Sequence, residues 1–139
     1  MKVLIMGSGR TGSLLAQMLD QAGHEVSIID WNADALTRLP DDFGGRTLLG
    51  NALDQDVLRL GGVETADVFV AATSGDNRNI VSGELAKFAF NVPRVVVRIK
   101  DPERAGYFAR KGLQVDCRTS EGTSILIDLA NRELLEQTA

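Results

Sequence analysis

The sequence has very few of the residues that build disulfides and metal centres. Its 139 residues include one cysteine, Cys117, and one histidine, His24. A single cysteine excludes an internal disulfide and a cysteine-cluster metal site, and this usage is typical of a reducing cytosol. We expect Cys117 to be a buried structural residue of a strand. We expect His24 to be a solvated residue of a helix-to-strand turn.

Long apolar runs and an excess of positive charge are also missing. No stretch approaches the roughly 18 consecutive apolar residues of a membrane span, so we expect any membrane association to go through another protein. Lysine and arginine number 15 against 19 aspartate and glutamate residues, which gives a formal net charge of −4. This balance argues against nucleic acid and anionic membranes as main ligands. The first seven residues are too short for a signal-peptide core.

What the sequence does contain is a regular alternation of strand and helix patterns. Short runs rich in β-branched residues begin about 20 residues apart, and segments with helical periodicity separate them. We expect strands over residues 3–6, 25–29, 46–49, 67–72, 94–99 and 115–118. We expect helices over residues 10–22, 33–39, 53–60, 77–90, 102–111 and 122–136.

Several of these strands are apolar at every position rather than at alternate positions, as in residues 68–72 and 95–97. Strands that helices cover on both faces have this character. We therefore predict an α/β protein with a Rossmann-like, doubly wound, parallel six-stranded sheet in the order βαβαβαβαβαβα. One domain of about 100 to 150 residues uses the whole length, so an activity that needs two domains would borrow one from a partner.

A glycine-rich loop directly follows the first strand and opens the first helix. It has the G-x-G-x-x-G pattern in the segment Gly7-Ser8-Gly9-Arg10-Thr11-Gly12. In such a loop Gly7 permits the tight turn, Gly9 lets a phosphate approach the backbone, and Gly12 lets the helix and strand pack closely. The helix N-terminus adds free N–H groups and about half a positive charge.

Arg10 lies inside this loop, where the variable positions face the phosphates. A fixed cation there favours a ligand with more negative charge than a dinucleotide pyrophosphate, such as ADP or ATP. The alternative is a surface arginine at a helix start, where it would oppose the helix dipole.

Asp30 ends the second strand 18 residues after Gly12. A carboxylate at this place can accept hydrogen bonds from both ribose hydroxyls of an adenosine. A role as the N-cap of the next helix is an alternative that is compatible with binding. Trp31 and Asn32 follow instead of an arginine, so a 2′-phosphate lacks a counter-charge and NADP is disfavoured. The loop and Asp30 together predict an adenine-nucleotide site.

With these motifs the sequence resembles the RCK N-terminal domain family, the regulator of K⁺ conductance domain that is also called KTN or Trk N-terminal. The family occurs in cytosolic subunits of bacterial potassium uptake systems and channels. The resemblance covers essentially the whole chain. Beyond the glycine loop and Asp30, it rests on residues 50–52, residues 72–74, Asp76, Asn79 and residues 98–102.

The resemblance implies roles for residues at the strand ends. The glycine loop and its arginine would bind phosphates, and Asp30 would bind ribose. Asn51 matches a position beside the adenine that is normally aspartate, and Thr73 and Ser74 match the loop over the nucleotide. The expected nucleotide-binding residues are therefore Gly7, Ser8, Gly9, Arg10, Thr11, Gly12, Asp30, Trp31, Asn51, Ala52, Thr73, Ser74 and Arg98.

Glu121 is the candidate metal ligand. It matches an acid that in some members helps to hold a divalent cation, such as Mg²⁺, between the nucleotide phosphates of two subunits. The residue before it is Ser120, where the family usually has proline. The alternative is an ordinary acid that stabilises a helix N-terminus.

The last helical segment is apolar around most of its circumference. Its apolar side chains spread over roughly 280°, whereas a helix lying on one domain needs a stripe of about 100°. These residues are Ile125, Leu126, Ile127, Leu129, Ala130, Leu134 and Leu135. We expect residues 1–118 to form the nucleotide-binding core and residues 119–139 a crossover helix that dimerises with a twofold-related copy. The alternative is a helix that is frayed or buried in a groove of its own domain.

The resemblance implies a regulatory function. A homodimer, or a ring of more subunits, would bind NAD(H), ATP, ADP or AMP and gate a membrane-embedded potassium transport subunit by rearranging, since a ligand shifts the geometry that it binds better. The chain would then be cytoplasmic and would reach the inner face of the membrane through that partner. Most members also carry a smaller C-terminal ligand domain, so we expect either a piece of a longer protein or a short form with a second protein.

Two other functions compete with this one. The chain could be the cofactor-binding domain of an NAD-dependent oxidoreductase without its substrate domain, or a stand-alone nucleotide sensor outside potassium transport. Against the enzyme, the single histidine falls in a turn at the opposite end of the sheet from the glycine loop, so no general acid or base is evident.

Overall fold

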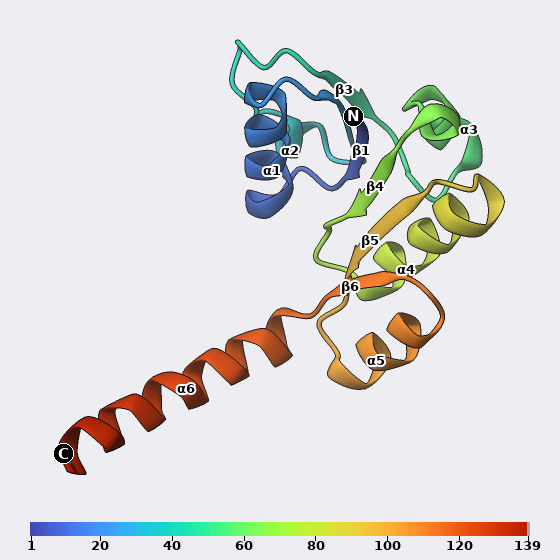
Figure 1. Cartoon of the computed structure of the whole chain (residues 1–139). Coiled ribbons are helices and arrows are strands. Elements are labelled where there is room, and N and C mark those ends of the chain that lie inside the picture. Colours follow the sequence, from blue (N-terminus) through green and yellow to red (C-terminus); the bar gives the residue numbers. More distant parts are fainter. Residues whose placement is uncertain (139) are drawn as a thin grey trace.

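The computed structural model describes residues 1–138, with side chains described as far as residue 132. Six parallel strands form one sheet in the order β3-β2-β1-β4-β5-β6 (Figure 1). This order confirms the predicted Rossmann-like fold. Successive strands are added toward one edge of the sheet from β1 to β3 and toward the other edge from β4 to β6, and ligands bind at the point between β1 and β4 where the order changes. The strands are β1 (Lys2–Met6), β2 (Glu25–Asp30), β3 (Arg46–Leu49), β4 (Val68–Ala71), β5 (Arg94–Arg98) and β6 (Gln114–Asp116).

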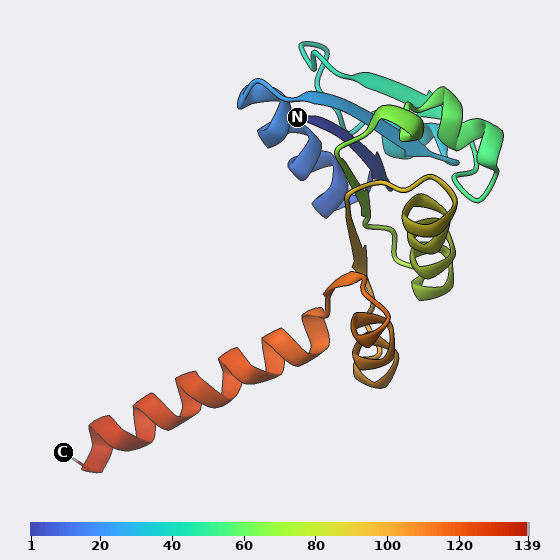
Figure 2. The ribbon, with the colours of Figure 1, turned by 45° about the vertical axis from the view of Figure 1, so that its right-hand side comes forward.

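Helices cover both faces of the sheet. The helices α1 (Arg10–Gln21) and α2 (Ala33–Leu36) lie on one face. The opposite face is covered by α3 (Gln55–Leu60), α4 (Asp76–Glu84) and α5 (Pro102–Arg110), as Figures 1 and 2 show. Strand β1 is therefore buried on both sides, with Leu4 and Ile5 almost fully inaccessible. Each such side chain contributes about 1.5–3 kcal/mol through burial, which explains the unbroken apolar run.

One half of the sheet is covered less completely. On β4 and β5, the side chains that face α4 are buried, whereas those on the α1 face are covered less completely. Val68, Val70 and Val96 are only half-buried. The continuous apolar character of these strands predicted cover on both faces, and within the described residues this chain supplies it fully on one face only.

Several element boundaries differ from the predicted ones. Helix α2 ends at Leu36 rather than at residue 39, because the next three N–H groups donate to carbonyls three residues back instead of four. Helix α3 begins at Gln55, with Asp54 as its N-cap. The helix predicted over 77–90 is α4 followed by one wide π-helical turn, Leu85–Ala89, and a short 3₁₀ turn at Val63–Thr65 was not predicted.

The end of the chain forms α6 (Arg118–Thr138), which begins four residues before the predicted Gly122. Strand β6 correspondingly ends at Asp116, so Cys117 follows the strand; it is buried as expected. Figures 1 and 2 show α6 projecting away from the sheet. Ile125 and Leu126 are 58% and 68% exposed, which contradicts the alternative of a helix buried in its own groove.

Leu134 and Leu135, also counted in the apolar face of this helix, lie outside the described side chains. Within the described residues, no helix combines the length and the apolar character needed to cross a lipid bilayer. His24 lies in the turn between α1 and β2 as predicted, but it is half-buried rather than fully solvated. Its Nδ1 is 3.3 Å from the amino-terminal nitrogen of Met1.

Candidate functional site

The three glycines of the loop between β1 and α1 have different surroundings. Gly7 has a φ of +105°, and a Cβ on Gly12 would lie 1.8 Å from the carbonyl oxygen of Gly7. The protein itself therefore requires glycine at both positions. A Cβ on Gly9, by contrast, would meet no atom within 4 Å. The backbone at Gly9 thus faces open space where the sequence predicts a phosphate.

Asp30, at the end of β2, is held in place by backbone groups. Its Oδ2 accepts a hydrogen bond from the N–H of Ser8, and its Oδ1 accepts one from the N–H of Asn32, both at 2.8 Å. Each oxygen keeps a lone pair for a further donor, so the carboxylate can still accept two ribose hydroxyls. The alternative role of Asp30 as an N-cap is wrong, because Asn32 caps α2 by accepting from the N–H of Asp34.

Ser8 differs from its neighbours in the loop because it faces inward. Its side chain is fully buried, and its hydroxyl donates to the carbonyl oxygen of Ala35 at 2.9 Å. Its backbone N–H orients Asp30. The structure therefore gives the Ser8 side chain a supporting place behind the loop, with no open path to the cavity in front of it.

A cavity of about 430 Å³ opens at the carboxyl ends of the strands. It lies in front of the glycine loop and the N-terminus of α1, and it brings together residues from four strand ends. The expected binding residues in its lining are Gly7, Gly9, Arg10, Thr11, Asp30, Trp31, Thr73, Ser74 and Arg98. Gly12 lies behind the loop, where it packs against Gly7.

A second, much smaller cleft of about 20 Å³ adjoins this cavity. Asn51 and Ala52, the residues expected beside an adenine, line it. The Oδ1 of Asn51 accepts from the N–H of Leu53 at 3.0 Å, which leaves the amide group of Asn51 free to donate. We call this the base-side cleft and the larger one the phosphate-side cavity.

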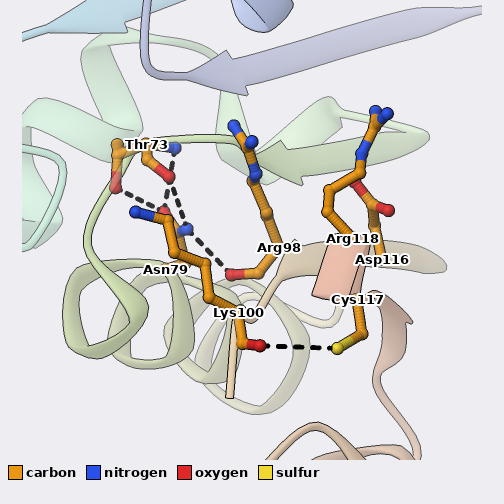
Figure 3. Close-up of polar contacts among 7 residues, drawn as sticks. All are labelled: Thr73, Asn79, Arg98, Lys100, Asp116, Cys117 and Arg118. Carbon is orange, nitrogen blue, oxygen red and sulfur yellow. Dashed lines mark hydrogen bonds and ion pairs between the residues drawn. The ribbon is translucent and has the colours of Figure 1, made fainter. Parts of the chain in front are cut away.

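Arg98, at the end of β5, lines the phosphate-side cavity and carries an unsatisfied donor. Its Nε is buried and has no hydrogen-bond partner within the described residues. Buried donors without partners are rare in proteins, so this atom points to a ligand that the site would hold. In Figure 3 the guanidinium of Arg98 points away from α4. The side chain of Arg118, which pairs with Asp116 at 3.0 Å, points the same way.

Asn79 connects two parts of the site that are distant in sequence. This fully buried residue of α4 accepts from the N–H and the hydroxyl of Thr73, at 3.0 and 2.6 Å. Its amide donates to the carbonyl oxygens of Thr73 and Arg98, at 3.0 and 2.9 Å (Figure 3). Asn79 therefore fixes the loop after β4 against the end of β5. The sequence motif included this residue, but its spacing alone gave no role.

The charge of the phosphate-side cavity is positive. Arg10, Arg78 and Arg98 line it together with one carboxylate, Asp30. Within residues 1–132, none of these arginines forms an ion pair. Arg78 was missed by the sequence analysis, because nothing in its local pattern distinguishes it from any other residue of a first helical turn. Such a site suits a phosphate ligand.

The candidate metal ligand stands apart from the cavity. Glu121 is exposed in the first turn of α6 and belongs to neither cavity lining. Within the described part of the chain, no three histidine, cysteine or acidic side chains gather at a potential metal site. A metal role for Glu121 stays a prediction that needs a second subunit.

A family model, the TrkA-N domain, matches residues 3–117. The chain belongs to the TrkA-N domain family. The match spans the sheet except for Lys2, the first residue of β1, and includes every expected nucleotide-binding residue. It confirms the resemblance to RCK N-terminal domains. This TrkA-N domain is 47% identical over 113 residues to the Trk system potassium uptake protein TrkA of Streptomyces coelicolor. It is 39% identical over 111 residues to the protein of the same name from Vibrio alginolyticus.

These matches cover 81% and 80% of the chain, but only 51% and 24% of the two relatives. This TrkA-N domain thus spans about half of the length of the first of these curated proteins and about a quarter of the second.

Solved structures share the fold. The TrkA-N domain of the inner membrane protein ybaL from Escherichia coli superimposes with a TM-score of 0.81 at 22% identity, over 92% of this chain and 95% of that one. The Kef CTD of Shewanella denitrificans in AMP-bound form gives 0.76 at 25%, over 96% and 82%. GsuK bound to ADP gives 0.78 at 24%, over 95% of this chain and 34% of that one.

Proposed function

We propose that this TrkA-N domain binds an adenine nucleotide and regulates a membrane-embedded potassium transport subunit. The observation that carries the proposal is the open space in front of Gly9, which faces a cavity lined by three arginines and Asp30. A phosphate-bearing ligand fits these residues because it can use the free loop backbone and the guanidinium of Arg98, which has no ion-pair partner within residues 1–132. The TrkA relatives support the link to potassium uptake.

Different residues of the site bind different parts of the nucleotide. The N–H groups at the start of α1 and the side chains of Arg10 and Arg98 receive the phosphates. Asp30 accepts the ribose hydroxyls, and Asn51 flanks the base. The AMP-bound and ADP-bound neighbours support this ligand class, which also includes ATP and NAD(H). Arg10 favours ADP and ATP over ligands with less negative charge.

The regulated unit is a homodimer in this proposal. The exposed apolar side chains of α6 need cover, as do Leu14 and Met18 on α1, which are more than half exposed. A second copy whose α6 packs over the half-covered face of β4 and β5 would cover its own α6 and the exposed apolar side chains on α1. Nucleotides bound at the carboxyl edge then favour one geometry of the dimer, and the transport subunit responds to it. A ring of several dimers would work in the same way.

Glu121 has a place in this assembly. Because it lies in the first turn of the crossover helix, it would reach the partner's phosphates and share a divalent cation such as Mg²⁺ with them. The domain itself would be cytoplasmic and would lie at the inner face of the membrane through its transport partner.

We propose regulation rather than catalysis. The cavity lining contains no histidine or cysteine. His24 lies in the turn before β2, at the amino edge of the sheet, whereas the cavity opens at the carboxyl edge. A nicotinamide oxidoreductase would need a proton donor or acceptor near the reacting carbon. Hydride transfer by the isolated chain with common alcohols or hydroxy acids would contradict this part of the proposal.

The first test is a ligand panel. Thermal-shift and calorimetric titrations with AMP, ADP, ATP, NAD, NADH and NADP should show stabilisation by several of them, since a ligand that binds only the folded state raises the apparent stability. NADP should bind more weakly than NAD, because its 2′-phosphate meets the carboxylate of Asp30. A panel without any shift would contradict the nucleotide site.

A further inference from the structure

Arg78 and Trp31 form a stacked pair at the mouth of the site. The guanidinium carbon of Arg78, on α4, lies 4.4 Å from the centre of the Trp31 ring, which follows β2. Gly75 leaves the space for this arrangement: a Cβ there would lie 3.0 Å from the Nε of Arg78. The guanidinium therefore lies close to both the backbone of Gly75 and the indole. Within residues 1–132 it has no carboxylate partner.

This pair stands where the two cavities meet. Trp31 and Arg78 belong to the lining of the base-side cleft and also to that of the phosphate-side cavity. The base-side cleft, at about 20 Å³, has room for a water molecule but not for a purine. The phosphate-side cavity measures about 430 Å³. With the pair in place, the site is open to phosphates and closed to the base.

This inference rests on the proposed nucleotide binding. We propose that Arg78 selects ligands by their phosphates: it leaves Trp31 to pair with phosphate, and its departure opens the base-side cleft to the adenine. A charge-assisted hydrogen bond to phosphate is stronger than a cation–π contact at an exposed site, so phosphate favours the exchange. Adenosine offers Arg78 no such partner and has to displace it without compensation.

The distinguishing prediction is a pair of effects of opposite sign in one variant. In Arg78→Ala, ADP should bind about tenfold more weakly, because a phosphate contact is lost. Adenosine should bind about twofold to fivefold more tightly, because the closure is gone. Isothermal titration of the 139-residue chain with each ligand measures both. Arg59→Ala is the matched control, since that guanidinium also stacks on a ring, Phe90, at 5.2 Å but lies outside both cavity linings.

A measurement on the unaltered chain gives a second readout. Trp31 is the only tryptophan of the sequence, so fluorescence excited at a wavelength that tyrosine does not absorb reports on its ring alone. Saturating inorganic pyrophosphate should change the emission although it carries no base, because its phosphate groups draw the guanidinium away from the ring. Unchanged emission with pyrophosphate that calorimetry shows to be bound would contradict the exchange, whatever the fold of any variant.

The remaining outcomes separate this inference from the function on which it rests. Suppose that the unaltered chain binds ADP, but that Arg78→Ala either leaves the affinities for ADP and adenosine unchanged or lowers both equally. Arg78 then does not exchange Trp31 for phosphate, and the inference is overturned while the nucleotide site stands. If the unaltered chain binds none of the adenine nucleotides, the proposed function and the inference are both wrong.

Discussion

At the residue scale, Asn79 is the side chain that joins the loop after β4 to the end of β5. It makes four hydrogen bonds to Thr73 and Arg98 from a fully buried position. Two of its partners are backbone carbonyls and one is a backbone N–H, and these hydrogen bonds are partly buried. Both residues that it positions line the phosphate-side cavity.

We expect Asn79→Ala to lower the free energy of unfolding by about 2–3 kcal/mol, because it removes four hydrogen bonds and leaves partly buried backbone groups without partners. It should also weaken nucleotide binding, because Thr73 and Arg98 lose their fixed positions. Urea unfolding and calorimetry with ADP measure the two effects. Asn77→Ala is the control: its side chain is exposed and accepts a hydrogen bond from Arg104. Equal stability of the two variants would remove Asn79 from this positioning role.

The glycine and aspartate positions of the site could be predicted from sequence, because their chemistry depends on strand ends and spacing. Gly7 and Gly12 have the backbone roles expected of them. The direction of individual side chains could not be predicted in this way. Ser8 turns inward to Ala35, and Arg78 reaches Trp31 from another element. Both depend on tertiary contacts between segments far apart in the chain.

At the scale of elements, α6 is the least covered part of the molecule. Its described side chains from Thr123 onward are exposed on every side, although several are large and apolar. Exposed apolar surface of this kind marks a site of association. The half-buried valines of β4 and β5 offer a complementary face.

Charges placed on this helix should prevent dimer formation. The double variant Ile125→Glu and Leu129→Glu puts two carboxylates one helical turn apart on the same face, and light scattering should then give the mass of a monomer. Asp128→Asn, also on α6 and exposed, is the control and should remain dimeric. A dimer that persists in the double variant would place the interface elsewhere.

The kinds of element and their order could be predicted well, while their ends could not. Hydrophobic periodicity indicates whether a segment is a strand or a helix, but it does not change when the element is one residue longer or shorter at either end. The early start of α6 at Arg118 illustrates this, because polar residues fill its first turn and leave no periodic signal. The π-helical turn at Leu85–Ala89 likewise depends on packing rather than on composition.

At the scale of the whole molecule, the few cations of the cavity matter more than the net charge. The chain carries a formal charge of −4, yet three arginines converge on one cavity at the carboxyl edge of the sheet. The acid excess argues against polyanionic partners as main ligands, but it does not reveal this candidate site for a small anion. Topology made that site, because the parallel order brings the ends of β1, β2, β4 and β5 together.

The central claim is that this cavity binds an adenine nucleotide through Asp30, and titration of the chain with ADP by calorimetry tests it most directly. The account predicts saturable binding that Asp30→Ala weakens at least about tenfold. The ribose hydroxyls lose their acceptor, and the N–H of Ser8 in the glycine loop loses its hydrogen bond to Asp30. Asp34→Ala, an exposed acid on α2, should leave binding unchanged. Equal affinity of the unaltered chain and Asp30→Ala for ADP would contradict the account.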